Sequence, residues 1–163
     1  VVSSLFADGA AATLITRRSS AYVPDIQLHF FTSRRVPSGA DLLSWRLGEP
    51  AFRMGLRKGL PDVVRAEVNR VRAGRDLNPG ARLGWAIHPG GRAVLDVVQD
   101  ALGLDAAQVA PSRRVLSEFG NMSSPTLLFV LAAMPKDKRS GVALAFGPGL
   151  SLEGFQWSRP SRR

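Results

Sequence analysis

The spacing of apolar side chains along the chain predicts several helices. Val64, Val68 and Val71 recur at intervals of four and three residues with charged side chains between them, which indicates an amphipathic helix that opens at Leu60 and ends near Gly74. The same reasoning predicts three further helices. They lie at residues 93–102, at residues 105–119 with a break at Pro111, and at residues 126–134 after a serine cap and a proline at 123–125.

Short apolar runs between these helices predict strands. Residues 10–16 (AAATLIT) are almost fully apolar, as in strands buried inside a layered sheet, and residues 26–31 alternate in polarity. A tight turn at 147–149 joins the last two strands. The remaining strands are expected at 82–87, 141–146 and 150–157. Strands and helices that alternate along the chain predict an α/β layered fold.

The amino-acid composition excludes several classes of protein and several kinds of functional site. With 163 residues, of which 45% are hydrophobic, the chain can form one compact domain or a piece of a larger one, and it is not a wholly disordered protein. It contains no cysteine, so a disulfide framework, a thiolate metal site and a cysteine nucleophile are excluded within it, and we expect no metal site. No run of about 18 apolar residues is present, which excludes a transmembrane helix. We expect a cytoplasmic protein.

The net charge of +9, from 22 basic and 13 acidic residues, raises the question of a polyanionic partner. The arginines are dispersed in pairs, however, and the only dense run is residues 158–163. We expect a solvated basic surface with a disordered basic tail at 158–163, and neither a nucleic acid nor a membrane as partner. The alternative, a nucleic-acid binder, predicts DNA binding that weakens steeply with salt.

A histidine and an asparagine at the ends of predicted elements can carry chemistry. His88 ends the strand at 82–87 just before a Pro-Gly-Gly turn, where ligands of α/β sheets bind, although a structural histidine fits equally well. Asn121 alone fits a left-handed turn residue or a helix N-cap. If the two side chains face one cleft, they can donate two hydrogen bonds to one thioester carbonyl and form an oxyanion hole, and the histidine can keep a neighbouring cysteine ionised. His29 has no polar neighbour in sequence, and we expect it to be structural.

Four blocks of sequence resemble one known family. They are LFADGAAATLI, WAIHPGGRAVLD, EFGNMSSPTLLFVL and LAFGPGLSLE, and together they span nearly all of the chain. Their order and their combination of HPGG, GNMSS and FGPG resemble the C-terminal half of the chalcone and stilbene synthases, also called type III polyketide synthases. Initiating ketoacyl synthases also pair histidine with asparagine, but they lack this combination.

The resemblance implies a fold and an activity. It implies the thiolase-like layered αβαβα fold, built from two similar halves and assembled as a homodimer. In this family a cysteine accepts an acyl group from a CoA starter, and malonyl-CoA is decarboxylated and condensed onto it in repeated rounds. The expected partners are therefore an acyl-CoA starter and malonyl-CoA, with no cofactor beyond these CoA thioesters.

The resemblance also implies roles for single residues. His88 and Asn121 match the catalytic histidine and asparagine, which would stabilise the enolate formed on decarboxylation. Phe6 and Met54 match two gatekeepers between the CoA tunnel and the cavity. The other matches are Ser123 in the cavity, Ala93 near the tunnel mouth, and Phe146, Gly147, Pro148 and Gly149 in the loop that shapes the cyclisation cavity. From the residues alone, these positions fit ordinary core or turn residues equally well.

Three positions depart from the family pattern. Ala7 stands where glycine is usual, Arg92 where proline often follows HPGG, and Met54 where phenylalanine is normal. A thioether is more flexible than an aromatic ring, so Met54 predicts a different starter preference.

The family nucleophile lies in the half that this sequence does not contain. The chain opens at Val1 rather than at methionine, so we expect residues 1–157 to be the C-terminal half-domain of a longer synthase, inactive without its N-terminal half. The alternative is a non-catalytic thiolase-fold protein that dimerises or binds acyl-CoA. The content of arginine and alanine hints at a bacterial source.

Overall fold

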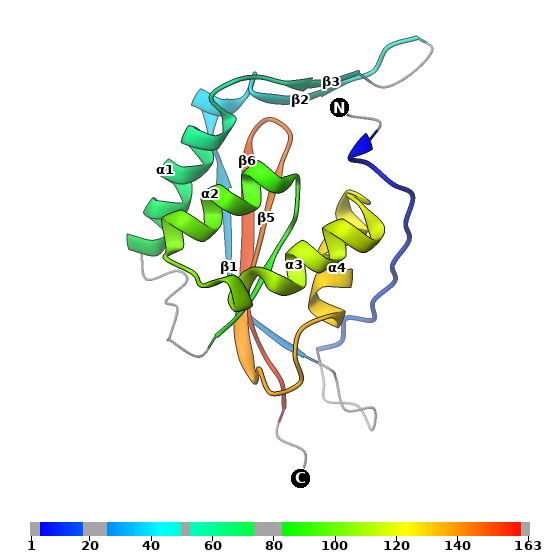
Figure 1. The fold of residues 1–163 in the computed structure, drawn as a ribbon, viewed down its shortest axis with the longest axis vertical. Helices are drawn as coiled ribbons and strands as arrows, with labels where there is room; N and C mark the ends of the chain where they lie inside the picture. Colours follow the sequence, from blue (N-terminus) through cyan, green and yellow to red (C-terminus); the bar gives the residue numbers. More distant parts are fainter. Residues whose placement is uncertain (1–3, 18–25, 50–52, 74–82, 161–163) are drawn as a thin grey trace.

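A four-stranded mixed sheet forms the centre of the structure (Figure 1). The computed structural model describes residues 4–17, 26–49, 53–73 and 83–160. The strand order is β1-β6-β5-β4, with β4 parallel to β5 and the other pairs antiparallel. The strands are β1 (Gln27–Arg35), β4 (Gly84–Ile87), β5 (Ser140–Gly147) and β6 (Ser151–Ser158). This sheet and its helices confirm the predicted α/β class.

The four predicted helices are present on the two sides of the sheet. They are α1 (Leu60–Ala73), α2 (Arg92–Leu102), α3 (Ala106–Phe119) and α4 (Ser124–Ala132). The predicted break at Pro111 is wrong, because α3 continues through this buried proline. A capping box between Asp105 and Gln108 fixes the first turn of α3, and this offsets the one backbone hydrogen bond that proline cannot donate. None of the helices in the described ranges is long and apolar enough to cross a membrane.

Two apolar clusters lie on opposite faces of β4 and β5. Trp85 and Ile87 of β4 belong to a cluster with α1 and α2, whereas Ala86 between them belongs to a cluster with α4. Figure 1 shows α1 to the left of the strands, α2 across their front and α4 to the right. Successive side chains of a strand point to opposite faces, so β4 and residues 141–146 of β5 are apolar because both faces of these strands are covered.

A separate hairpin, which the sequence did not suggest, is formed by β2 (Leu43–Arg46) and β3 (Arg53–Leu56). Each strand has only four residues, and their mixed polarity carries no clear period. The hairpin is attached to the turn between β5 and β6, because Gly149 N donates a hydrogen bond of 2.9 Å to Leu43 O. A short 3₁₀ helix, η2 (Pro37–Gly39), lies between β1 and β2.

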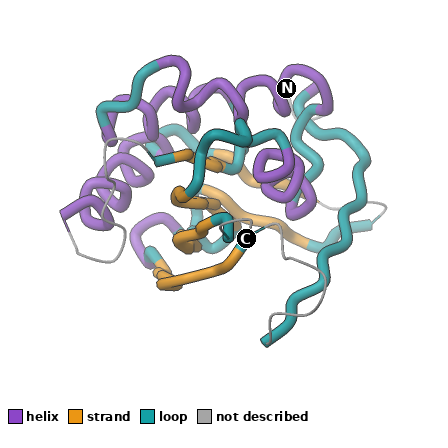
Figure 2. Tube along the Cα trace, turned by 90° about the horizontal axis from the view of Figure 1, so that it is seen from below, coloured by secondary structure: helices purple, strands orange, loops and turns teal. Residues whose placement is uncertain are grey.

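The predicted buried strand at residues 10–16 is wrong. These residues form no strand and are exposed, with Leu14 and Ile15 at 88% and 74% of their full accessibility. Figures 1 and 2 show the segment as an extended loop along the outside of the molecule. A strand exists only beside a hydrogen-bonded neighbour, and no described strand runs beside this segment.

The predicted strand near residues 26–31 is longer than expected and contains a bulge. The register of β1 against β6 shifts between His29 and Phe31, and Phe30 at the shift has φ of +42°. The extra residue leaves Phe30 and Phe31 both exposed.

The basic tail predicted at residues 158–163 overlaps the sheet. Ser158 is the last residue of β6, and the carbonyls of Arg159 and Pro160 accept hydrogen bonds from Arg139 Nη2 at 3.3 and 2.6 Å. Residues 161–163 lie outside the described residues.

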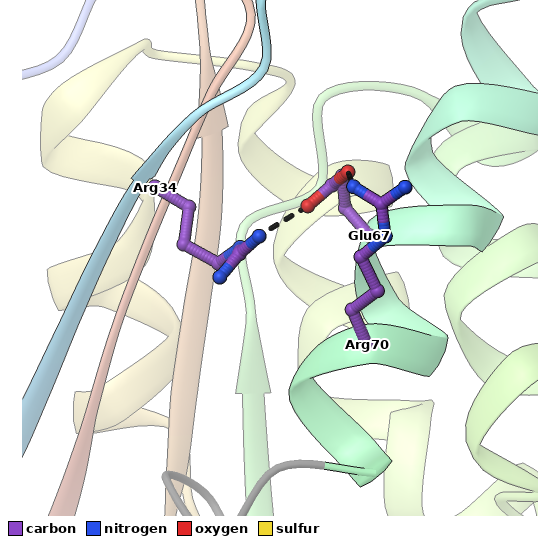
Figure 3. Close-up of polar contacts among 3 residues, drawn as sticks. All are labelled: Arg34, Glu67 and Arg70. Carbon is purple, nitrogen blue, oxygen red and sulfur yellow. Dashed lines mark hydrogen bonds and ion pairs between the residues drawn. The ribbon is translucent and has the colours of Figure 1, made fainter.

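A buried carboxylate connects α1 to the sheet (Figure 3). The side chain of Glu67 is 4% exposed, and its Oε2 accepts a hydrogen bond of 3.2 Å from Arg34 Nε on β1. Its Oε1 accepts one of 2.7 Å from Arg70 Nη1, one turn further along α1. Both carboxylate oxygens are therefore charge-paired, which makes the burial of this charge tolerable.

Candidate active site

His88 lies at the carboxyl edge of the two parallel strands. It follows β4 directly, and its backbone N–H donates to Leu144 O of β5 at 2.7 Å. Gly90 N then donates to His88 O at 2.9 Å and turns the chain toward α2. Burial lowers the pKa of His88 from 6.5 to about 4. At pH 7 the imidazole is neutral and can donate a hydrogen bond from one ring nitrogen while the other accepts.

Asn121 is held against the turn that follows His88. Its Nδ2 donates to Gly90 O at 3.4 Å, and its Oδ1 accepts from Ser123 N at 2.9 Å. The side chain has two amide hydrogens, so one N–H remains without a partner among the described residues. The structure thus brings the two predicted catalytic residues to the same edge of the sheet.

The segment that contains Phe6 fixes the backbone of Asn121. Asn121 N donates to Leu5 O at 2.8 Å, Ala7 N donates to Asn121 O at 3.0 Å, and the two stretches form an isolated parallel bridge at Phe6. Gly120 just before it has φ of +73°, a conformation that glycine adopts without strain. The backbone around Asn121 is therefore held from both sides.

Ser123 occupies the N-cap position of α4, but it does not act as the predicted side-chain cap. It has φ of +61°, its side chain is exposed, and no hydrogen bond from the first turn reaches its hydroxyl. Thr126 supplies a local contact instead, because its hydroxyl accepts from Met122 N at 2.8 Å. A non-glycine residue in this conformation is strained, which is common beside functional sites.

The two residues matched to gatekeepers are connected through Trp45, which the sequence did not single out. The rings of Phe6 and Trp45 meet edge to face, with centroids 6.0 Å apart and planes at 79°. Trp45 on β2 lies directly opposite Met54 on β3. Directly opposed residues of an antiparallel pair share one face, so Phe6, Trp45 and Met54 form one group. The sequence shows only that Trp45 is an aromatic residue nine positions before Met54. That it contacts Phe6 and faces Met54 follows from the hairpin, which the sequence did not predict.

The other matched residues surround the same edge of the sheet. Phe146 lies two residues beyond Leu144, past the end of β4, and Gly147 ends β5. Pro148 is exposed in the following turn, and Gly149 has φ of +87° there. The whole turn is thus placed beside the hairpin that carries Trp45.

Ala93 lies in the first turn of α2 and is exposed. Arg92 before it is also exposed, and Gly91 is the N-cap. Within the described part of the chain, no group of three histidine, cysteine, aspartate or glutamate side chains could hold a metal ion.

Comparison with known proteins assigns the chain to a family. The profile of the chalcone and stilbene synthases, C-terminal domain, matches residues 27–158. The chain is 31% identical over 170 aligned positions to Type III polyketide synthase A of Arabidopsis thaliana, covering 95% of this chain and 43% of that protein. It is 32% identical over 175 positions to Type III polyketide synthase 10 of Oryza sativa subsp. japonica, covering 93% of this chain and 43% of that protein.

The chain therefore belongs to the chalcone and stilbene synthase family, as its four sequence blocks predicted. Its sheet and helices form the thiolase-like α/β fold of the C-terminal domain of that family. The chain spans less than half of the length of the curated relatives that it matches.

Proposed function

We propose that this chain is the C-terminal part of a type III polyketide synthase, which condenses malonyl-CoA with loss of CO₂ onto an acyl-CoA starter. The observation that carries the proposal is the hydrogen bond from Asn121 to Gly90, in the turn that follows a neutral His88. It holds an amide, one of whose N–H groups has no partner among the described residues, against the turn that follows an imidazole that can donate. Family membership supports the same reaction class.

His88 and Asn121 would act on the thioester carbonyl of malonyl-CoA. When the bond between the carboxylate carbon and Cα breaks, CO₂ leaves and the electron pair moves onto the thioester as an enolate. The two N–H groups donate to the enolate oxygen and lower the energy of the charge that develops there. The enolate carbon then attacks the acyl thioester on cysteine, a carbon–carbon bond forms, and the cysteine thiolate leaves. This cysteine would come from the part of the synthase that precedes the chain.

The other grouped residues would shape the substrate path. Phe6, Met54 and Trp45 would form the gate between the tunnel for CoA and the cavity, and Ala93 would line the tunnel mouth. Ser123 would contact the growing polyketide. The loop of Phe146, Gly147, Pro148 and Gly149 would shape the cavity in which the product cyclises. We also propose a cytoplasmic homodimer that needs no cofactor besides its CoA thioester substrates.

A second function is compatible with the absence of cysteine from all 163 residues, although a synthase whose cysteine lies in another part of the protein predicts the same absence. A thiolase-fold protein without a nucleophile could bind acyl-CoA or dimerise without turnover. The two functions differ in what happens when the chain is joined to a cysteine-bearing N-terminal portion. Only the polyketide synthase gains turnover, whereas the binding protein does not.

The test measures CO₂ release from malonyl-CoA by the synthase that contains both portions. We expect the unaltered protein to decarboxylate, and His88→Ala or Asn121→Ala to lose roughly 100-fold or more, the scale of losing one oxyanion donor. Asn69→Asp, an exposed change on α1, is the control. Near-normal turnover in both site variants would overturn the assignment of His88 and Asn121. No turnover in the unaltered protein, with acyl-CoA still bound, would favour the second function.

A further inference from the structure

A pocket of about 270 Å³ lies between the start of α2 and the end of α3, beside the segment that carries Phe6. Two arginines, Arg92 on α2 and Arg113 on α3, belong to its lining. The other described residues that line it are Ser4, Leu5, Leu116, Ser117 and Gly120, and none of them is acidic. The volume is below the usual range for drug-sized ligands, so the pocket suits a small group rather than a large molecule.

One face of α2 meets one face of α3 at this pocket. Arg92, Asp96 and Gln99 recur at intervals of four and three residues along α2, so they share one face of the helix. Arg113 on α3 contacts that face, because its Nη2 donates to Asp96 Oδ1 at 2.6 Å and to Gln99 Oε1 at 2.8 Å. Arg92 therefore lies one turn before Asp96 on the side of α2 that faces α3, which places its side chain beside the pocket.

Arg113 is a fixed donor that does not use all of its N–H groups. Asp96 and Gln99 accept only from its Nη2. Its Nε and Nη1 together carry three further N–H groups, and none of these has a partner among the described residues. Because two acceptors already hold this guanidinium in place, it can donate to a ligand without first being ordered.

Arg92 forms no hydrogen bond or ion pair with any residue that the structure describes. Asp96, one turn further along the same face of α2, is already paired with Arg113. Arg92 is also the first residue of α2, where the helix dipole disfavours a positive charge. Two arginines against one carboxylate leave a charge of +1 here, and no acidic residue is among the described lining residues, so the pocket favours an anion.

We propose that this pocket binds a phosphate group. A carboxylate has two oxygens, and one guanidinium can satisfy both, whereas the three terminal oxygens of a phosphate ester can accept from two guanidinium groups at once. Both arginines of the pocket donate to these oxygens, and the rest of the ester lies against Leu5 and Leu116. Ser117 is not a donor to the phosphate, because its hydroxyl already donates to Arg114 O at 2.9 Å.

The phosphate group can come from two kinds of molecule. The pocket adjoins the candidate active site, because Asn121 N donates to Leu5 O at 2.8 Å and Gly120 precedes Asn121. A CoA thioester, the proposed substrate of that site, carries phosphates. The other source is a small phosphate compound that is not a substrate. Phosphate binding is a property of this chain, and only its assignment to CoA rests on the proposed function.

The first experiment titrates the chain with inorganic phosphate and, separately, with acetate at constant ionic strength. The readout is the Nε–H signals of Arg92 and Arg113 in a ¹H–¹⁵N correlation spectrum, assigned by single replacement. We expect phosphate to shift both signals in a saturable way. Acetate is expected to bind roughly ten-fold more weakly, because it has fewer acceptor oxygens for the two guanidinium groups.

Variants of the two arginines test the named contacts. Arg92→Gln should lower the affinity for phosphate roughly ten-fold or more, because one charged donor is lost. Arg92→Pro should cause the same loss and leave α2 intact, since proline is favoured at the first position of a helix. The control is Arg35→Gln, which removes the same charge from an exposed position on β1 outside the pocket. Arg113→Lys should also weaken phosphate, because the fixed fork is lost, whereas Arg114→Lys on the same helix should not.

The second experiment identifies the source of the phosphate in the full synthase. It compares malonyl-CoA with malonyl-N-acetylcysteamine, a thioester without phosphate. If a phosphate of CoA occupies the pocket, Arg92→Gln should raise KM for malonyl-CoA roughly ten-fold, leave kcat unchanged and leave the kinetics of the other thioester as they were. If phosphate binding to the chain is lost while both KM values stay the same, a separate phosphate compound is the ligand. A synthase that decarboxylates neither thioester would contradict the proposed function, and the titration of the chain would still decide this proposal.

Three results would overturn the proposal. No saturable shift of the Arg92 and Arg113 signals by millimolar phosphate would mean that the pocket is not an anion site. Equal binding of phosphate and acetate would mean that the phosphate group is not recognised. Unchanged affinity for phosphate in both Arg92→Gln and Arg92→Pro would place the anion elsewhere.

Discussion

Asn121 and Glu67 are buried to the same extent, each with 3% of its surface exposed, yet their surroundings differ. Both oxygens of Glu67 accept hydrogen bonds from arginines on two elements. Asn121 uses its oxygen and one N–H and keeps the second N–H without a partner among the described residues. A buried polar group whose hydrogen bonds are complete holds the fold together, whereas one that keeps a donor at the edge of a sheet can act on a substrate.

The positions of the two residues explain this difference. Glu67 lies in the interior of α1 and faces β1, where only neighbouring side chains can reach its carboxylate. Asn121 follows the end of α3, and its partners are backbone atoms of Gly90 and Ser123. Backbone partners hold the amide in one orientation without using all of its hydrogens.

The largest expected effect comes from removing both partners of Glu67. The double variant Arg34→Ala, Arg70→Ala leaves a buried carboxylate without a counter-charge, so the free energy of unfolding should fall by about 3 kcal/mol. Urea denaturation measures it. Arg65→Ala is the control, because it breaks an exposed ion pair with Asp100 and should cost less than about 1 kcal/mol. Equal losses in the two variants would mean that Glu67 is not the buried centre of this network.

Replacing the amide of Asn121 by a carboxylate tests the other half of the comparison. Asn121→Asp can still accept from Ser123 N but has no N–H to donate, so decarboxylation of malonyl-CoA by the full synthase should fall roughly 100-fold. The matched change Glu67→Gln should leave the turnover of folded protein unchanged and lower stability only. If Glu67→Gln lowered turnover as much as Asn121→Asp did, the distinction between the two residues would fail.

A smaller effect concerns His88 and pH. Its pKa in the folded chain, about 4, is below the ordinary value of 6.5, so the unfolded chain takes up a proton first as the pH falls. The stability that neutral His88 provides is complete above pH 6.5 and is lost as the pH falls toward 4. Between pH 7 and 4.5 the unaltered chain should lose about 2 kcal/mol more than His88→Gln. Parallel stability profiles for the two chains would contradict the burial of a neutral imidazole.

The smallest effect concerns Trp45, whose side chain is half exposed, whereas the other two tryptophans are buried. Acrylamide should quench mainly the fluorescence of Trp45, since Trp85 and Trp157 are 2% and 1% exposed. Trp45→Phe should therefore remove most of the quenching, with little change in stability. In the full synthase, Trp45→Ala should shift the preference among starters a few-fold toward bulkier acyl groups. Unchanged quenching would show that Trp45 is not the accessible ring.

The helices, and the residues at the edge of the sheet that carries His88, could be predicted because their signals are local. The spacing of Val64, Val68 and Val71 marks one face of α1, and the Pro-Gly-Gly turn after His88 marks the end of β4. These features depend on contacts within a few residues, and they do not require knowledge of what packs against them. The prediction that Ser123 caps α4 with its side chain was wrong. A serine hydroxyl can cap a helix only when the φ and ψ angles of the serine aim it at the first turn, and those of Ser123 do not.

Contacts between distant segments could not be predicted in the same way. The sequence of residues 10–16 suits a buried strand, but burial depends on a neighbouring strand that local pattern does not reveal. Phe6, Trp45 and Met54 form a group only because the hairpin of β2 and β3 contacts the distant segment that contains Phe6. The indole Nε1 of Trp157 is buried without a hydrogen-bond partner among the described residues. This depends on which atoms surround the ring, and the pattern of residues along the chain does not reveal those atoms.

The sequence by itself determined the family, the α/β class and the identity of His88 and Asn121 as candidates. It did so because conformational preferences and motif blocks are properties of short segments. The tertiary structure alone decided that Asn121 is held by Gly90 and Leu5, that burial keeps His88 neutral, and that Trp45 connects Phe6 with Met54. These features depend on hydrogen bonds, desolvation and ring contacts between residues far apart in the chain, which form only when the chain is folded.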